Sequence, residues 1–246
     1  MKKWTAVICL SLCLSPFALP PASAEAAWNR LVRSVKNLVG SPSLQDQEVV
    51  AGLKEALRLG TENSVNQVGR PGGFLNNPKI RIDLPAPLAR GEKLLRYAGY
   101  SEQLEAFETS MNRAAEQAAP QARSIFLQAI GEMTLADAQK ILHGGETAAT
   151  DYFAAQTRPG LAEAFTPIVR RSLAEVDATS RFQNLNTTFR NLPFGENLHI
   201  DLDQYVTNGA LDGLFFVLGE EERKIRRNPA ARTTELLQKV FAATDN

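Results

Sequence analysis

Apolar residues recur at spacings of three and four along most of the chain, and long runs of alternating apolar and polar positions are missing. The first spacing places side chains on one face of an α-helix, whereas alternation is typical of a strand. Glycines, prolines and capping residues divide the pattern into segments. The predicted helices cover residues 28–39, 43–69, 88–98, 101–118, 120–132, 134–143, 146–156, 159–176, 178–191, 203–227 and 229–243. The pattern therefore predicts an all-α fold, a single compact domain of about eleven short-to-medium helices.

Residues 70–87 interrupt this pattern with four prolines and two glycines, so they cannot form a helix. Long ordered loops are often functional. Within this loop, Ile80 and Ile82 flank Arg81 in a short run that resembles residues 198–202 further along the chain. The sequence therefore marks 70–87 as a candidate functional loop and allows one minor two-stranded β element between the two runs.

The predicted 203–227 helix carries an almost continuous apolar run, in which Asp212 is the only charge between Ala210 and Leu218. Such a pattern predicts a largely buried, central helix. We expect Asp203 to cap its N-terminus, because aspartate side chains accept hydrogen bonds from the first free backbone N–H groups.

The end of the same helix is strongly charged. Glu220 and Lys224 are four residues apart, as are Glu222 and Arg226. This spacing predicts two ion pairs along the helix surface, with the basic end favourable to the helix dipole.

The first 24 residues have the features of a secretory signal peptide. Lys2 and Lys3 precede an apolar stretch, residues 4–19, and Ala22-Ser-Ala24 is a small-x-small cleavage site. The apolar stretch is interrupted by proline and is shorter than the roughly 20 residues that a membrane span needs. We therefore expect a periplasmic protein, cleaved near Ala24, with a helical domain at 25–246 and no integral span after cleavage.

Export also removes both cysteines, since Cys9 and Cys13 lie within the signal peptide. The mature chain keeps 25 basic and 27 acidic residues of the original 27 and 27, a formal net charge of −2. Nucleic-acid binding draws on uncompensated basic clusters, so we expect no nucleic-acid partner. The chain also lacks a phosphate-binding loop, a dinucleotide fingerprint and a nucleophile elbow, and we expect no cofactor.

Metal binding has little support. Glu196-Asn-Leu-His199 has the Glu-x-x-His spacing of helical metal sites, but it follows Pro193 and Gly195 in a segment that we interpret as a loop or short strand. His143, the other histidine, stands beside a helix-ending glycine pair. We predict no metal site.

Polar residues repeat on one face of the predicted 101–118 helix. Glu108, Asn112 and Glu116 are four residues apart, and Arg113 neighbours them. Two carboxylates on one face can act as acid and base if they are buried, although such a row is more often a solvated face.

Two further polar residues complete the candidate set. Asp151 belongs to a second polar group, and Asn77 lies in the 70–87 loop. If these groups converge with the loop, they form a polar ligand pocket. The candidate ligand-binding residues are Glu108, Asn112, Arg113, Glu116, Asp151 and Asn77.

Three functions remain open, and the sequence does not decide whether the protein is an enzyme. The first is a binding module for a small molecule or an envelope protein. The second is a metal-independent hydrolase or lyase that uses Glu108 with Glu116 or Asp151. The third is a structural protein of the envelope that binds through apolar residues such as Trp28 and Phe241.

Several ordered motifs resemble an uncharacterised bacterial family, DUF4197. They are Gly52-Leu-Lys-Glu-Ala-Leu57, Gly72-Gly-Phe74 with Asn77, Phe107-Glu108 with Met111-Asn-Arg-Ala-Ala-Glu116, Ala148-Ala-Thr-Asp-Tyr-Phe153, Tyr205-Val-Thr207, and Asn228-Pro-Ala-Ala-Arg232 with Thr234. The resemblance covers about residues 47–242 in order and implies an exported helical protein. It implies no activity, because the family has no established function.

Overall fold

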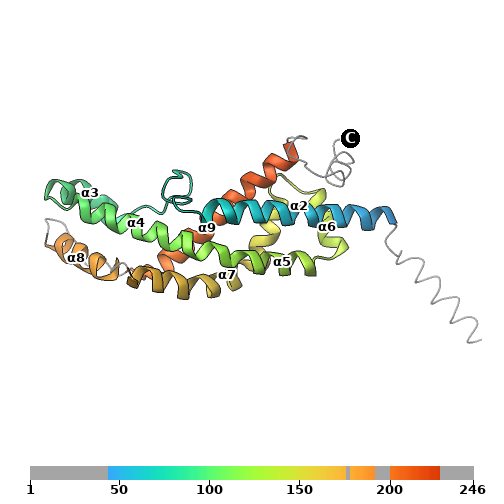
Figure 1. Ribbon diagram of the computed structural model, residues 1–246. Coiled ribbons are helices and arrows are strands. Elements are labelled where there is room, and N and C mark those ends of the chain that lie inside the picture. Colours follow the sequence, from blue (N-terminus) through green and yellow to red (C-terminus); the bar gives the residue numbers. More distant parts are fainter. Residues whose placement is uncertain (1–43, 176–177, 192–199, 228–246) are drawn as a thin grey trace, which may run out of the picture. The chain divides into compact units, whose positions relative to one another are not determined.

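The computed structural model describes residues 44–175, 178–191 and 200–227, and these residues are helical almost throughout. The all-α prediction is confirmed for them. The helices are α2 Leu44–Gly69, α3 Ala86–Tyr97, α4 Ser101–Ala118, α5 Ala122–Glu132, α6 Leu135–Leu142, α7 Ala148–Glu175, α8 Ala178–Arg190 and α9 Leu202–Arg227, with a 3₁₀ turn, η1 Ala119–Gln121, between α4 and α5 (Figure 1).

The chain divides into two units, Met1–Ser43 and Leu44–Asn246, and all described residues belong to the second. The predicted helices at 28–39 and 229–243 lie outside the described residues. No helix within the described part is long and apolar enough to cross a membrane.

Within the described residues there is one α-helix fewer than predicted, because the helices expected at 146–156 and 159–176 form one continuous helix, α7. Pro159 lies inside α7 rather than at the start of a new helix. An interior proline costs about 3 kcal/mol. However, Phe153 and Leu161 on either side of it are fully buried, and burying each such side chain stabilises the fold by about 1.5–3 kcal/mol. Packing of one long face therefore outweighs the local preference for a break.

Helix α9 forms the centre of the fold, where it packs against α2, α4 and α7 (Figure 1). Val206, Ala210, Leu211 and Leu214 are fully buried, which confirms the predicted central helix. Phe216 differs from that prediction, because 38% of its surface is exposed. One side of α9 therefore faces solvent although its sequence is mainly apolar.

The start of α9 lies one residue earlier than predicted, and Asp203 is not its cap. Asp201 Oδ1 accepts a hydrogen bond from the Gln204 backbone N–H at 2.9 Å, which is the N-cap interaction. Since the helix begins at Leu202, Asp203 already lies in the first turn. Its carboxylate pairs with Arg170 of α7 at 2.6 Å instead.

The irregular segment between α2 and α3, residues 70–85, lies against the exposed side of α9 (Figure 1). Two glycines of α9 allow this contact. A Cβ atom at Gly209 would lie 3.0 Å from Ile82 Cγ1, and one at Gly213 would overlap the ring of Phe74. Side chains of the loop therefore pack directly on the backbone of α9.

Candidate functional site

The polar row on α4 faces the 70–85 segment. Glu108, Asn112 and Glu116 lie four residues apart on one side of the helix, and each side chain interacts with a different part of this segment. These three residues therefore lie beside the loop. Each side chain of the row contacts a particular group of the segment: Glu108 contacts Arg81, Asn112 contacts the backbone of Ile82, and Glu116 contacts the backbone of Phe74.

Asn112 is fully buried and holds the middle of the loop. Its Oδ1 accepts from the Ile82 N–H at 2.8 Å, and its Nδ2 donates to the Ile82 carbonyl at 2.9 Å. Nδ2 also donates to the Glu108 carbonyl at 2.8 Å. A side-chain amide thus satisfies both backbone groups of a buried residue, as a neighbouring strand would do.

This arrangement corrects the expected β element. Ile80 and Ile82 lie in the irregular segment, and Leu202 is already part of α9, so residues 80–82 form no strand with it. Residues 198 and 199 lie outside the described residues. The physical reason is that Asn112 supplies the hydrogen bonds that a partner strand would have supplied to Ile82.

Glu116 anchors the beginning of the loop. Its Oε1 accepts hydrogen bonds from the backbone N–H groups of Phe74 and Leu75, at 3.0 and 3.2 Å. The side chain is only 6% exposed. A buried carboxylate needs such donors, because burial without them costs several kcal/mol. The structure therefore uses the Glu116 carboxylate to position the loop.

Glu108 is the most exposed of the three, and its side chain is still only 17% exposed. Its carboxylate lies 3.4 Å from the Arg81 guanidinium. Burial raises the pKa of Glu108 above its ordinary value, and the nearby Arg81 opposes this effect without cancelling it. The folded protein therefore holds a proton on Glu108 more tightly than the unfolded chain does.

This shift predicts a pH-dependent contribution to stability. Relative to Glu108→Gln, the wild-type protein should lose free energy of unfolding as the pH rises from 4.5, the ordinary value, through the raised pKa of the folded state. Below that window the difference between the two proteins should be constant. Urea unfolding of both proteins between pH 3.5 and about 7.5 measures it. A difference that grows in favour of the wild type with rising pH would contradict the shift.

A groove lies between residues 79–83 and α9, with a volume of about 940 Å3 including its open mouth. Its walls combine backbone of the loop with one exposed side of the helix. The residues from α9 are Tyr205, Asn208, Gly209, Asp212, Gly213 and Phe216.

Several groups that line the groove already have partners within the protein. The Tyr205 hydroxyl donates to the Asp83 carbonyl at 3.0 Å. Asp212 pairs with Arg158 of α7 at 2.6 Å. Lys79 pairs with Glu220 at 3.3 Å. Lys224 pairs with Glu221 at 3.5 Å instead of with Glu220, so the predicted pair of Glu220 with Lys224 is wrong.

The remaining candidate residues are placed differently. Asn77 is half-buried in the turn before the groove, where its Oδ1 accepts from the Lys79 N–H at 3.1 Å. Arg113 is exposed on α4. Asp151 is exposed in the first turn of α7, where Thr147 Oγ1 donates to it at 3.4 Å. The structure thus brings three of the six predicted residues, Glu108, Asn112 and Glu116, to the 70–85 segment, which itself contains Asn77.

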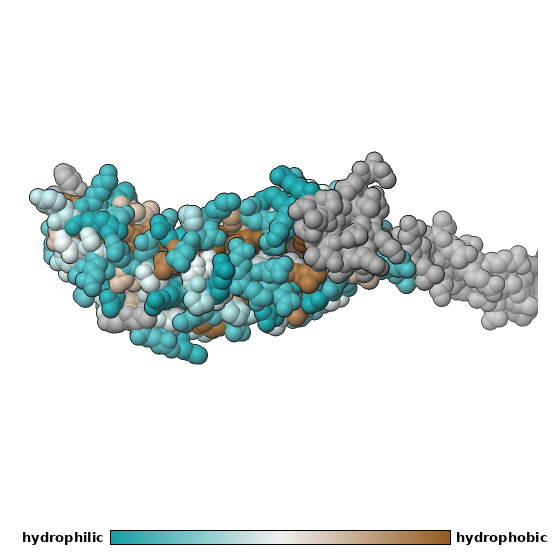
Figure 2. Space-filling model, turned by 45° about the horizontal axis from the view of Figure 1, so that its top comes forward, coloured by the Kyte–Doolittle hydropathy of each residue, from teal (hydrophilic) through white to brown (hydrophobic). Residues whose placement is uncertain are grey.

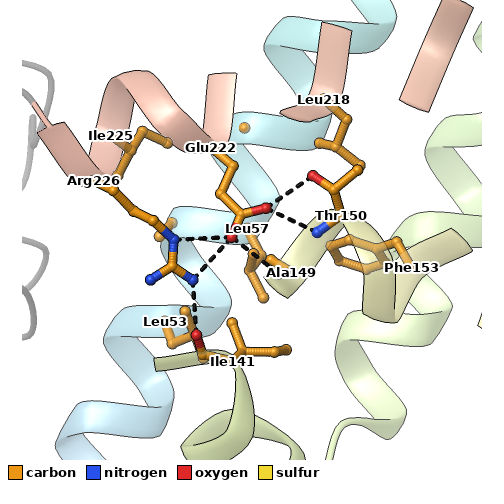
Figure 3. Close-up of a pocket in the computed structure, with 12 residues that line it drawn as sticks. Leu53, Leu57, Ile141, Ala149, Thr150, Phe153, Leu218, Glu222, Ile225 and Arg226 are labelled. Atoms are coloured by element: carbon orange, nitrogen blue, oxygen red, sulfur yellow. Dashed lines mark hydrogen bonds and ion pairs between the residues drawn. The ribbon is translucent and has the colours of Figure 1, made fainter. Parts of the chain in front are cut away.

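A second hollow, apolar and about 390 Å3 in volume, is lined by residues of α2, α6, α7 and α9 (Figure 3). Glu222 forms its polar side. This carboxylate accepts from the backbone N–H groups of Ala149 and Thr150, at 3.0 and 2.9 Å, and so caps the N-terminus of α7. Arg226 pairs with Glu222 at 2.9 Å and donates to the Ile141 carbonyl near the end of α6 at 2.7 Å.

The predicted pair of Glu222 and Arg226 is therefore confirmed, but it is not a surface pair. The two side chains are 9% and 15% exposed. Their hydrogen bonds join three helices, as the dashed lines in Figure 3 show. The charged groups of this hollow have structural partners, and its other walls are apolar.

With this geometry, the sequence can be compared with known proteins. The model of a family described as a protein of unknown function, DUF4197, matches residues 43–242. The chain belongs to the DUF4197 family. No curated protein and no solved structure matches it.

Within the described ranges, no three His, Cys, Asp or Glu residues lie close enough to hold a metal ion. His143 is exposed at the end of α6, where its Nδ1 lies 2.9 Å from the Gln139 carbonyl oxygen. Residues 196–199, which contain the Glu-x-x-His spacing, lie outside the described residues.

Sequence reasoning missed the α9 side of the groove in this family member. Asn208 and Asp212 lie one turn apart on a helix that was expected to be buried. The signal was present: Asp212 is a lone charge in an apolar run, and Gly209 and Gly213 are four residues apart. Small residues at such spacing allow close contact with another segment, but the sequence does not say which segment makes it.

Proposed function

We propose that the mature protein is a periplasmic binding module whose ligand occupies the groove between residues 79–83 and α9. One observation carries this proposal. The groove is open, yet its loop wall is held in place by two buried side chains, Asn112 and Glu116, that reach from another helix. A wall that is already ordered lowers the entropic cost of binding.

The charges around the groove indicate the kind of ligand. Lys79, Arg81 and Asp212 all have ion-pair partners of opposite sign. In contrast, the exposed side-chain amide of Asn208 has no hydrogen-bond partner among the described residues. These features favour a neutral, polar ligand that forms hydrogen bonds over a strongly charged one.

The periplasmic location follows from the expected signal peptide and is part of the proposal. A thermal-shift screen of the purified mature protein against neutral metabolites, short peptides and phospholipids tests binding. A ligand at one hundred times its Kd stabilises the folded state by about 2.7 kcal/mol, which raises the Tm by about 5 to 10 °C.

A pair of tryptophan variants then locates the site. Asn208→Trp fills the groove and should abolish the rise in Tm, because the indole occupies the ligand's place. Asn63→Trp is the matched control, since Asn63 is also an exposed helical asparagine, on α2, with no hydrogen bond of its side chain among the described residues. The proposal fails if no compound raises the Tm of the wild type, or if both variants keep the full rise.

A second candidate function is a metal-independent hydrolase or lyase. The observation that favours it is the raised pKa of Glu108, a half-buried carboxyl that is paired with Arg81 in the wall of the groove. The Glu116 carboxylate already accepts hydrogen bonds from the loop backbone. Glu108 would therefore act as the acid or base alone, without Glu116 as its partner. If any turnover is found, Glu108→Gln should abolish it, and unchanged turnover would exclude this function.

The third function, a structural protein of the envelope, receives less support. Trp28 and Phe241, on which it was based, lie outside the described residues. On the face in Figure 2, hydrophilic side chains predominate and the hydrophobic ones form separate patches. The large apolar side chains exposed in the described residues are Leu94, Tyr97, Leu127 and Phe216.

A further inference from the structure

Residues 80–84 have the side-chain pattern of an extended strand, although they pair with no strand. Ile80, Ile82 and Leu84 are buried, whereas Arg81 and Asp83 are exposed. In an extended chain the backbone N–H and C=O groups of successive residues point to opposite edges, just as the side chains point to opposite faces. The segment therefore has two edges that can be examined separately.

One edge of this segment is satisfied from within the protein. The side-chain amide of Asn112 forms hydrogen bonds with both the N–H and the carbonyl of Ile82. The other edge faces α9, because the carbonyl of Asp83 accepts from the Tyr205 hydroxyl there. The Arg81 N–H is also satisfied, since it donates to the Asn77 carbonyl at 2.9 Å.

Two backbone groups remain on the edge that faces α9. Within the described part of the chain, neither the Arg81 carbonyl nor the Asp83 N–H has a hydrogen-bond partner, and both residues line the groove. In parallel pairing, one residue of a strand donates to residue i−1 and accepts from residue i+1 of its neighbour. An acceptor at 81 and a donor at 83 match this pattern around Ile82.

Antiparallel pairing fits the same edge less well. It pairs both backbone groups of Arg81 with one residue of the neighbour and both groups of Asp83 with another. Asn77 already binds the N–H of Arg81, and Tyr205 already binds the carbonyl of Asp83. Each antiparallel pair would therefore form only one of its two hydrogen bonds, whereas a single residue of a parallel strand forms both of its bonds with the two groups that are left.

We propose that the ligand of the groove is an extended peptide segment, which adds as a parallel strand to residues 81–83. This inference rests on the proposed function of the groove and names its class of ligand. Peptide backbone is neutral and rich in hydrogen-bonding groups, which agrees with the paired charges around the groove and the free amide of Asn208. Strand addition to an exposed edge is a recurrent mode of peptide recognition.

The side-chain preference of the peptide follows from the groove. Phe216 is 38% exposed, and the Lys79 ammonium lies 5.7 Å from its ring centre. This ring provides an apolar surface for a side chain of the bound strand. Asn208 is placed to bond a backbone or amide group of the peptide.

The test begins with a randomised ten-residue peptide library, displayed on phage and selected on the immobilised mature protein. A selected peptide is then synthesised, and its Kd is measured for two variants at one position. Asp83→Pro removes the backbone N–H, whereas Asp83→Ala removes the same carboxylate and keeps the N–H. We expect Asp83→Pro to weaken binding about tenfold more than Asp83→Ala does, because only the proline loses the hydrogen bond.

A scan of N-methylated peptides tests the same geometry without altering the protein. Each methyl group removes one N–H of the peptide. A single position should lose about tenfold in affinity through the bond to the Arg81 carbonyl, because one residue of a parallel strand pairs with this edge. The scan of N-methylated peptides therefore tests strand addition even if the Asp83→Pro variant does not fold.

The outcomes separate the ligand class from the function of the groove. If Asn208→Trp abolishes binding while Asp83→Pro equals Asp83→Ala and the scan is flat, strand addition is wrong and the groove remains a binding site. If the library yields no peptide but a metabolite binds in the groove, the peptide inference alone is overturned. If a selected peptide binds equally well to Asn208→Trp, both proposals fail.

Discussion

Replacing Glu222 by alanine is expected to destabilise the protein by about 3–5 kcal/mol, which lowers the Tm by about 6 to 20 °C. The carboxylate is 9% exposed and accepts hydrogen bonds from Ala149, Thr150 and Arg226. Its removal leaves two N–H groups of α7 without their acceptor and removes one buried ion-pair partner of Arg226. Such losses are large because the groups cannot be solvated by bulk water. Thermal and urea unfolding measure the effect.

An exposed pair of the same residue types provides the control. Glu146 pairs with Arg227, the residue after Arg226, but the two side chains are 54% and 66% exposed. Exposed pairs contribute at most about 1 kcal/mol, so Glu146→Ala should change stability by no more than this amount. Equal effects of Glu222→Ala and Glu146→Ala would show that the buried network does not hold the helices together.

Asn112→Ala is expected to destabilise the protein by about 2–4 kcal/mol. The substitution leaves the buried N–H and carbonyl of Ile82 without partners, and each unsatisfied group costs about 1–3 kcal/mol. It should also release the middle of the loop. Hydrogen exchange of the Ile82 amide should therefore accelerate far more than that of amides within α9.

The adjacent residue on the same helix is the reference for this experiment. Arg113 is exposed, and Arg113→Ala should alter stability by no more than about 0.5 kcal/mol. If Asn112→Ala behaves like Arg113→Ala, or if the Ile82 amide keeps its protection, the side chain of Asn112 does not hold the loop. The ordered wall on which the binding proposal depends would then lose its explanation.

Asn112 and Glu222 also show how far the sequence could predict the buried polar contacts of the fold. Their types and spacing were visible: Asn112 in a row of period four, and Glu222 four residues before Arg226. Period four indicates a shared helix face, but it does not say what covers that face. In both cases another segment covers it and turns an apparent surface row into buried anchors.

Local preferences failed where packing opposed them. Pro159 suited the start of a helix, yet it lies inside α7 because Phe153 and Leu161 bury a common face. Asp203 suited an N-cap, yet Asp201, two residues earlier, makes that bond, and Asp203 pairs with Arg170 instead. The alternation at residues 80–82 suggested a strand, yet a side-chain amide replaced the partner strand.

The sequence by itself determined the class of the fold and the place of the long irregular segment, because helical periodicity, glycine and proline are local properties of the chain. It also placed Glu108, Asn112 and Glu116 on one face of α4, since helical spacing determines relative direction. Only the tertiary structure decided that residues 70–85 cover this face and that α9 forms the other wall of the groove. The physical reason is that these contacts join residues 30 or more positions apart, and their free energy depends on which surfaces meet rather than on any local pattern.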